Sequence, residues 1–212
     1  MRAQQIQAIA AARAIPFLVH FTRVENLNSI IAHGLLPRTE IAAQGVQAII
    51  NDQQRWDGRL GGISTSIGFP NGQMLWKLRN DEPGSEWVQL VIRPSVLWTH
   101  DTLFCRHNAA DGRISCLPDA TLRHPDALGG LFEEIEGHQS RADQGLKLYD
   151  PTDVQAEALV LEPISADLID GVVFHTKASR DQNAAIIEPR RPFVHPGRKG
   201  FFANRTYFRK YG

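Results

Sequence analysis

The segment Gln155-Ala156-Glu157-Ala158-Leu159-Val160-Leu161 constrains the fold of this chain more than any other. It reads as a strand, because a polar and apolar alternation runs into an apolar stretch that ends at Pro163. In a strand, Gln155 and Glu157 face one side, while the alanines and Val160 face the other. A buried carboxylate is costly unless it has partners. The strand therefore either lines a functional cleft or turns its polar face to solvent at a sheet edge.

The length and composition predict one globular domain spanning residues 1–212. Hydrophobic residues make up 42% of the chain and charged residues 22%, which is ordinary for a soluble protein. No apolar run approaches the ~18 residues that a membrane span needs. Residues 1–7 lack the apolar centre of a secretion signal. We therefore expect a cytoplasmic protein without a membrane partner, in which Cys105 and Cys116 stay reduced.

The net charge of zero conceals a basic C-terminal tail. From Lys177 onward there are nine basic residues against two acidic ones. Aromatic residues are interleaved with these charges: Phe193, Phe201, Phe202, Tyr207, Phe208 and Tyr211. Basic side chains neutralise phosphates and aromatic rings stack on bases, so the tail suits single-stranded nucleic acid. Alternatively, a C-terminal strand pair packs its aromatics inward and pairs its arginines with the acidic body.

Hydrophobic periodicity predicts short helices and strands mixed along the chain. The expected helices are 2–13, 24–33, 39–50, 72–79 and 178–187, and the expected strands are 17–21, 61–67, 86–92, 155–161 and 171–175. Such a mixture favours an α+β fold over a regular βαβ array. Segments 99–130 and 136–153 show no regular pattern and are expected to be long loops, which are often functional.

Several familiar chemistries have no support in the sequence. GxGxxG and GxxxxGK[ST] are missing, as are the HExxH and CxxC patterns of metal sites and the GxSxG nucleophile elbow. We therefore expect no metal. His20, Thr22, Ser64 and Glu157 are polar residues in strand-like contexts, with Thr65 and Ser66 beside Ser64. They offer hydrogen bonds but no strong nucleophile, which suits a reaction at a sugar carbon that already carries a good leaving group.

Several motifs together resemble one known family. The chain carries His20-Phe21-Thr22, then Val24-Glu25-Asn26-Leu27-Asn28-Ser29-Ile30-Ile31, and His33-Gly34-Leu35. Further along it has Ser64-Thr65-Ser66-Ile67-Gly68-Phe69-Pro70-Asn71, Met74-Leu75-Trp76, Asn108-Ala109-Ala110 and Pro151-Thr152-Asp153-Val154-Gln155-Ala156-Glu157. Their order and spacing resemble DarT, the DNA ADP-ribosyltransferase toxin of DarT–DarG systems. The resemblance covers nearly the whole chain and is loosest at Arg205-Thr206-Tyr207-Phe208.

The resemblance implies an ADP-ribosyltransferase-like fold, in which two packed β-sheets form a cleft for NAD, the substrate. Glu157 would be the catalytic residue, holding the nicotinamide ribose and stabilising the positive charge that develops there. The residues expected to contact NAD are His20, Thr22, Asn28, Ser64 and Arg55. Those expected to contact DNA are Asn71, Met74, Trp76, Asn108, Arg205, Tyr207 and Arg209. A macrodomain antitoxin of DarG type would be the protein partner, and phage defence the biological role.

The sequence departs from the family at one segment. Better-known members carry an arginine in a segment like Pro-Arg-Ser-Pro-Met-Leu, where this chain reads Pro70-Asn71-Gly72-Gln73-Met74-Leu75. Arg55, Lys77 or Arg79 would have to supply the missing charge. Because that arginine contacts the target base in the family, we expect guanine rather than thymine as the acceptor. Transfer to RNA or protein, and a non-catalytic nucleic-acid-binding module, are the alternatives.

Local structure offers simpler explanations for some of these residues. His20 fits a core histidine, and Thr22 with Glu25 fits a capping box. Asn71 fits a helix N-cap. Met74 and Trp76, which lie in the same helix as Leu75 and Leu78, fit a packed helix face as well as a stacking platform for a base.

Overall fold

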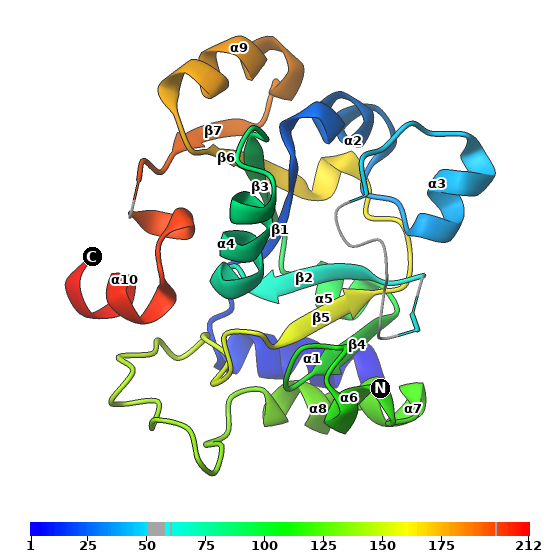
Figure 1. Ribbon diagram of the computed structural model, residues 1–212. Helices are drawn as coiled ribbons and strands as arrows, with labels where there is room; N and C mark the ends of the chain where they lie inside the picture. The colour runs from blue at the N-terminus through cyan, green and yellow to red at the C-terminus, as the bar shows by residue number, and fades with distance from the viewer. Residues whose placement is uncertain (51–57, 60, 198) are drawn as a thin grey trace.

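The computed structural model describes residues 1–50, 58–59, 61–197 and 199–212 (Figure 1). Its strands are β1 (Leu18–Arg23), β2 (Ile63–Ile67), β3 (Trp87–Ile92), β4 (Thr102–Cys105), β5 (Glu157–Val160), β6 (Ile169–Phe174) and β7 (Arg191–Val194). They form a seven-stranded sheet in the order β4-β5-β2-β1-β3-β6-β7. Neighbouring strands are antiparallel except β6 and β7, which run parallel. Strands and helices are mixed along the chain, so the expected α+β class is confirmed.

The sheet consists of two halves that meet at one short junction. β1 pairs with β3 along its whole length, from Leu18 to Arg23. On its other side β1 pairs with β2 at only two positions, Leu18 with Ile67 and Val19 with Ser66. In Figure 1, β2 and β5 run crosswise to β1 and β3. The two packed β-sheets expected to form the cleft are therefore the two halves of one seven-stranded sheet.

Ten α-helices and three 3₁₀ helices lie in the described residues. The α-helices are α1 (Arg2–Ala12), α2 (Leu27–His33), α3 (Arg38–Gln44), α4 (Gly72–Asp81), α5 (Val96–Thr99), α6 (Gly112–Ser115), α7 (Asp119–Leu122), α8 (Pro125–Gly130), α9 (Lys177–Ile187) and α10 (Arg205–Tyr211). The 3₁₀ helices are η1 (Val24–Asn26), η2 (Ala166–Leu168) and η3 (Gly200–Phe202). No helix in the described ranges is long and apolar enough to cross a membrane.

The main core lies where the central strands pack against α1. Leu18 of β1, Leu90 of β3 and Phe174 of β6 are fully buried there, together with Ile6 of α1. A separate cluster joins α4 to the strands through Leu75, Leu78 and Trp87, with Phe21 and Met74 packed against it. This second cluster fixes α4 beside β1, where it stands near the middle of Figure 1.

Most expected elements are present, and two expectations are wrong. The strands near 17–21, 86–92 and 171–175 and the helices near 2–13 and 72–79 are confirmed. Segment 99–130 is no loop, since it contains β4 and the short helices α6, α7 and α8. The tail forms one strand, β7, followed by η3 and α10, and not a strand pair.

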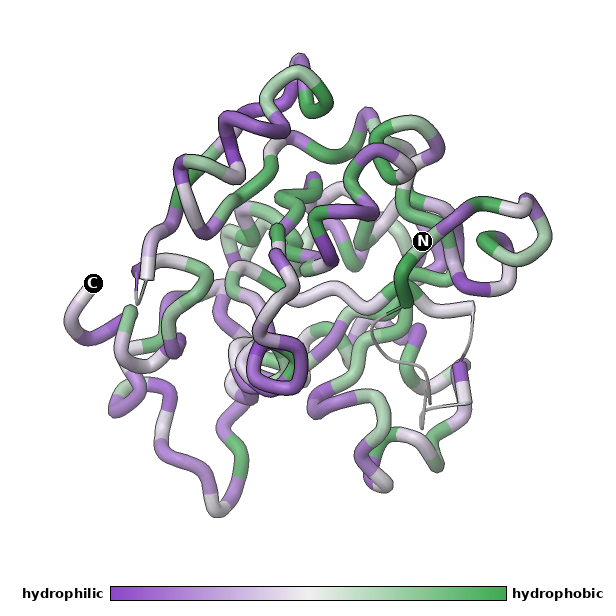
Figure 2. Tube along the Cα trace, turned by 45° about the horizontal axis from the view of Figure 1, so that its top comes forward, coloured by the Kyte–Doolittle hydropathy of each residue, from purple (hydrophilic) through white to green (hydrophobic). Residues whose placement is uncertain are grey.

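Segment 136–153 has neither helix nor strand, as expected, but it is well organised. Figure 2 draws it as a mainly hydrophilic loop at the lower left. Arg141 donates hydrogen bonds to the carbonyl oxygens of Asp150 (2.6 Å) and Lys147 (2.9 Å). The Lys147 backbone N–H donates in turn to the Asp150 carboxylate (2.8 Å). Polar contacts around Arg141 and Asp150 thus replace regular secondary structure.

Candidate active site

A cavity of about 420 Å³ opens where β1 and β2 separate. His20 and Thr22 of β1 line one wall, and Ser64 of β2 with Glu157 of β5 lines another. The pairing of β1 with β2 stops at Val19 and Ser66, so the residues that follow on β1 border open space. The cavity therefore results from the short junction between the two halves of the sheet.

Glu157 is the first residue of β5 and is buried, with 8% of its surface exposed. Its Oε2 accepts a hydrogen bond from the Ser64 hydroxyl (2.8 Å), and its Oε1 accepts one from the Asn108 side-chain amide (2.7 Å). Donors to both oxygens offset part of the cost of burying a carboxylate and fix its orientation. Glu157 therefore lines the cavity, and its strand is paired on both sides and is not a solvent-facing edge.

His20 is linked to Glu157 through a single residue, Ser64. The Ser64 carbonyl oxygen lies 2.8 Å from His20 Nδ1, and the Ser64 hydroxyl donates to Glu157. A carbonyl can only accept, so Nδ1 carries the proton and Nε2 remains an acceptor in the neutral ring. Burial lowers the pKa of His20, although the Ser64 hydrogen bond opposes this shift. His20 is therefore a neutral imidazole at the cavity wall.

Asn26 is a cavity residue that the sequence analysis missed. Its amide nitrogen donates to the Thr22 hydroxyl (2.9 Å) and to the Ile49 carbonyl oxygen (2.9 Å). The Ile49 backbone N–H donates back to the Asn26 side-chain oxygen (2.7 Å). These bonds hold the segment after α3 against η1, which directly follows β1. The Thr22–Glu25 capping box is wrong, because η1 has Arg23 as its N-cap and Thr22 bonds Asn26 instead.

Asn28, expected to contact NAD, is exposed and does not line the cavity. The reason is local geometry: the helix begins as the 3₁₀ turn η1, and Asn26 and Ser29 occupy the cavity side. The structure therefore gives no support to a contact of Asn28 with NAD, whereas Asn26 lines the cavity. Arg55 lies outside the described residues, so its role stays a prediction.

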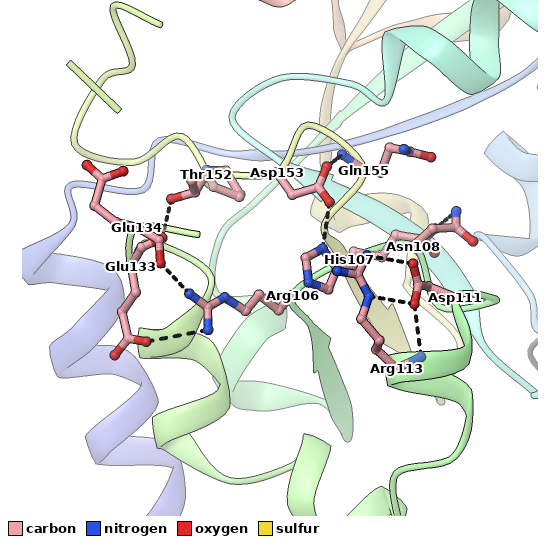
Figure 3. A network of polar contacts seen from close by, with 12 residues as sticks. Arg106, His107, Asn108, Asp111, Arg113, Glu133, Glu134, Thr152, Asp153 and Gln155 are labelled. Carbon is pink, nitrogen blue, oxygen red and sulfur yellow. Dashed lines mark hydrogen bonds and ion pairs between the residues drawn. The ribbon is translucent and has the colours of Figure 1, made fainter. Parts of the chain in front are cut away.

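A network of polar contacts holds the two loops that border Glu157 (Figure 3). His107 Nδ1 lies 2.7 Å from Asp153 Oδ2, and both side chains are nearly buried. Asp153 also accepts from the Gln155 backbone N–H (2.8 Å), which shapes the turn before β5. Gln155 lies in this turn rather than in the strand, and it lines the cavity beside Glu157. The loop after β4 and the turn before β5 are thus fastened together.

The side-chain amide of Asn108, a residue expected to contact DNA, donates a hydrogen bond to Glu157, and its side-chain oxygen accepts one from the Ala110 N–H (3.0 Å). These bonds orient Glu157; Asn108 also lines the cavity, and its contact with DNA stays a prediction. Figure 3 shows the neighbouring Asp111 held by Arg113, which also holds the pKa of the Asp111 carboxyl far below its usual range.

The two faces of α4 have different surroundings. Asn71 is the N-cap, accepting from the Met74 N–H (3.1 Å), so that local expectation is confirmed. Asn71, Met74 and Leu78 line the cavity. Trp76 is on the other side of the helix with 69% of its surface exposed, so the core-packing explanation is wrong for it. Contacts of Asn71, Met74 and Trp76 with DNA stay predictions.

Arg205 and Arg209 of α10 make internal contacts, which correct their expected role in DNA binding. Arg205 is 3% exposed and donates to the carbonyl oxygens of Pro151 (2.7 Å) and Thr152 (3.1 Å). Arg209 donates twice to the buried Asp150 carboxylate (2.7 and 2.8 Å). Burial lowers the pKa of Arg205 to about 10, so it stays cationic at neutral pH. Neither guanidinium faces solvent phosphates, whereas Tyr207 is exposed.

Of the three basic residues that could supply the charge of the missing arginine, Lys77 and Arg79 lie among the described residues. Lys77 forms an exposed ion pair with Asp81 (2.7 Å), and Arg79 stacks on Phe202. Neither lines the cavity, whereas Arg38 at the start of α3 does. Within the described ranges, His, Cys, Asp and Glu side chains form no group of three that could hold a metal ion.

Comparisons with known proteins agree with this geometry. A family model described as "ssDNA thymidine ADP-ribosyltransferase, DarT" matches residues 19–198. Thermosipho africanus DarTG in complex with ADP-ribose has a TM-score of 0.60 and 16% identity, covering 88% of this chain and 51% of that one. This chain thus spans about half the length of that DarTG protein. A comparison with curated proteins gave no match.

Two further similar structures are of Thermus sp. 2.9 DarT. The complex with NAD+ has a TM-score of 0.52 and 15% identity, covering 84% of this chain and 93% of that one. The complex with ADP-ribosylated ssDNA has a TM-score of 0.51 and 15% identity, covering 87% and 95%. At such low identity these likenesses show a shared fold.

Proposed function

We propose that this chain, which belongs to the DarT family, is an NAD-dependent ADP-ribosyltransferase that transfers ADP-ribose to guanine in single-stranded DNA. The observation that carries the proposal is the placement of Glu157. It is a buried carboxylate, oriented by Ser64 and Asn108, at a cavity that the neutral His20 also lines. NAD is the substrate of the proposed reaction, and nicotinamide is the leaving group.

The cavity side chains suit the two steps that this chemistry requires. As the bond between the ribose carbon and nicotinamide breaks, its electron pair leaves with nicotinamide and positive charge develops on the sugar. A fixed carboxylate such as Glu157 stabilises that charge without reorganising. A nitrogen of the base then forms the new bond to the ribose carbon and loses its proton, for which Glu157 is the acceptor. His20 Nε2 and the Asn26–Thr22 pair offer hydrogen bonds to the hydroxyl and amide groups of NAD.

The acceptor base is the finer part of the proposal. Guanine is supported by Asn71, which stands where better-known members have an arginine and caps α4 at the cavity. The family description names thymidine, which is therefore the competing base. The proposed DNA-contacting residues are Met74 and Trp76 on α4, Asn71 before it and the exposed Tyr207, while Arg205 and Arg209 are left out.

The test is a transfer assay on defined acceptors. The protein is incubated with NAD and single-stranded oligonucleotides that each contain one type of base in an otherwise inert context. We expect the mass of one ADP-ribosyl group on the guanine oligonucleotide. Modification of the thymine oligonucleotide alone would reverse the base assignment. Modification of RNA or protein acceptors and of no DNA would refute the proposed substrate.

The proposed partner is a macrodomain protein of DarG type in the same cytoplasm, and the proposed role is that of the toxin in a toxin–antitoxin pair that protects against phage. Its support is the match to Thermosipho africanus DarTG, half of which this chain covers. We also propose that residues 1–212 form a single domain. An oligonucleotide modified by this chain should lose its ADP-ribose when a DarG-type macrodomain is added. A mass that stays unchanged would count against the partner.

A further inference from the structure

A second cavity of about 420 Å³ lies on the other side of α4 from the candidate active site. Its aromatic walls are Trp76, Trp87 and Phe202, and its polar walls include Arg79 and Glu86. Its volume is within the range of about 300–1,000 Å³ that small-molecule sites occupy. Nothing in the proposed reaction at Glu157 uses this cavity.

The helical repeat explains why α4 borders both cavities. Met74 and Leu78 are four residues apart and face the active site, while Trp76 and Asn80 are also four apart and line the second cavity. The rise of about 1.5 Å per residue leaves the two sets only a few ångströms apart along the helix axis. The cavities are therefore separated by about one helix diameter, on the order of 10 Å.

Two charged side chains of the second cavity, Arg79 and Glu86, have bonding capacity that the described residues do not use. Arg79 stacks on Phe202 (5.4 Å to the ring centre) and makes no ion pair with any residue that the structure describes. Glu86 is exposed at the rim of the cavity; its Oε2 accepts from the Ser179 hydroxyl (3.0 Å), while its Oε1 has no hydrogen bond within the described ranges. Trp87 is 4% exposed and forms an aromatic wall of the cavity.

These features match the parts of one nucleotide. Trp76, with its ring largely exposed beside the opening, offers a surface on which a base can stack. A carboxylate accepts hydrogen bonds from the amino or ring N–H groups of a base, and a guanidinium pairs with a phosphate. A protein partner would be expected to meet a broad apolar surface, whereas this cavity mixes aromatic and charged walls.

We propose that the second cavity binds a base of single-stranded DNA that flanks the modified base, with Trp76 as its stacking partner. The inference rests on the proposed function, since it requires single-stranded DNA as the acceptor. The strand passes over α4, with the target base in the active-site cavity and the flanking base on Trp76. The second cavity then contributes to the sequence preference of the enzyme, because Glu86 accepts from the donor groups of the base, whose positions differ from one base to another.

The test combines a protein variant with single-stranded oligonucleotides that lack one base. An oligonucleotide that the wild type modifies is prepared with an abasic site at each position around the target in turn. We expect one flanking position at which loss of the base lowers kcat/KM by about 5- to 100-fold, the range for one stacked base. In Trp76→Ala the same abasic site should lower kcat/KM by less than about twofold, because the interaction is already lost. Trp76→Phe should restore most of the coupling.

Tyr211→Ala is the matched control, since Tyr211 is an exposed aromatic that lines neither cavity. It should show the same abasic profile as the wild type. If each abasic site lowered kcat/KM by the same factor in Trp76→Ala as in the wild type, the inference would be overturned. It would also be overturned if Tyr211→Ala changed the abasic profile as much as Trp76→Ala does. Failure of the wild type to modify any single-stranded oligonucleotide would instead refute the proposed function.

Discussion

Asp150 and Glu157 are two buried carboxylates on either side of the same turn, and their partners differ. Asp150 has no exposed surface and accepts two hydrogen bonds from the Arg209 guanidinium and one from the Lys147 N–H. Glu157 accepts from a hydroxyl and a side-chain amide and faces a cavity. The contrast separates a carboxylate that holds the fold from one that is oriented toward an open cavity. Variants at the two positions should therefore affect different measurements.

Glu157→Gln should have the largest effect on activity and little effect on stability. Glutamine keeps the shape of the side chain but loses the charge that stabilises the sugar cation and accepts the proton. Loss of a positioned general base alone costs about 10²- to 10⁴-fold in rate. The rate of nicotinamide release, measured beside the urea unfolding midpoint, checks this. A variant that hydrolyses NAD like the wild type would remove Glu157 from the catalytic role.

Asp150→Asn should have the opposite effect, a large loss of stability. It leaves the guanidinium of Arg209 buried without its carboxylate, and breaking a buried ion pair costs about 3–5 kcal/mol. Asp170→Asn is the matched control, because the Asp170–Arg93 pair (2.8 Å) is about half exposed and should be worth less than about 1 kcal/mol. The free energy of unfolding of both variants decides the matter. Equal losses would contradict a structural role specific to Asp150.

Asn108→Ala should weaken catalysis by an intermediate amount. Its amide donates to Glu157, and a hydrogen bond to a charged group is worth about 1.5–3 kcal/mol, or roughly 10- to 150-fold in rate. The effect should fall on kcat more than on KM for NAD. Asn28→Ala is the control, since Asn28 is exposed outside the cavity and should leave both constants unchanged. A larger effect of Asn28→Ala would restore the original expectation for that residue.

The smallest effect concerns His20 and pH. Burial holds its folded pKa below the unfolded value of about 6.5. The unfolded chain therefore binds the proton more readily, and the stability contributed by neutral His20 is complete above pH ~6.5 and is lost as pH falls through the lowered folded pKa. His175 and His195, whose pKa values burial also lowers, act in the same direction. His20→Asn should show a shallower loss of unfolding free energy from pH 7 to pH 5 than the wild type, and an identical profile would exclude His20 as a source.

The sequence predicts elements well where they are long and regular. Helix α4 was expected at 72–79 because Asn71 caps it and Leu75 and Leu78 share its buried face. Segment 99–130 could not be read in this way. Its elements β4, α6 and α7 have four residues each. Such short elements do not show a periodic pattern of hydrophobic residues, since four residues make only about one helical turn.

The candidate site was predictable only in part. Glu157, His20 and Ser64 stand in strand-like segments that match a known family, and the structure brings them together at one cavity. The His107–Asp153 contact and the Asn26–Ile49 bonds join residues far apart in the sequence, so no local pattern announces them. The prediction that Arg205 and Arg209 in the basic tail contact DNA was not supported for a similar reason. The composition of the tail gives its charge, but only the fold shows that Arg205 and Arg209 form hydrogen bonds inside the protein.

The contacts of α10 form late, because α10 is near the C-terminal end of the chain and is synthesised last. Arg205 and Arg209 hold residues 150–152, which lead directly into the turn before Glu157. A ribosome therefore completes every cavity residue well before it supplies the two arginines that secure the catalytic segment. A nascent or prematurely terminated chain should be inactive although it contains the whole site. A product ending at residue 203 that released nicotinamide at the full rate would disprove this dependence.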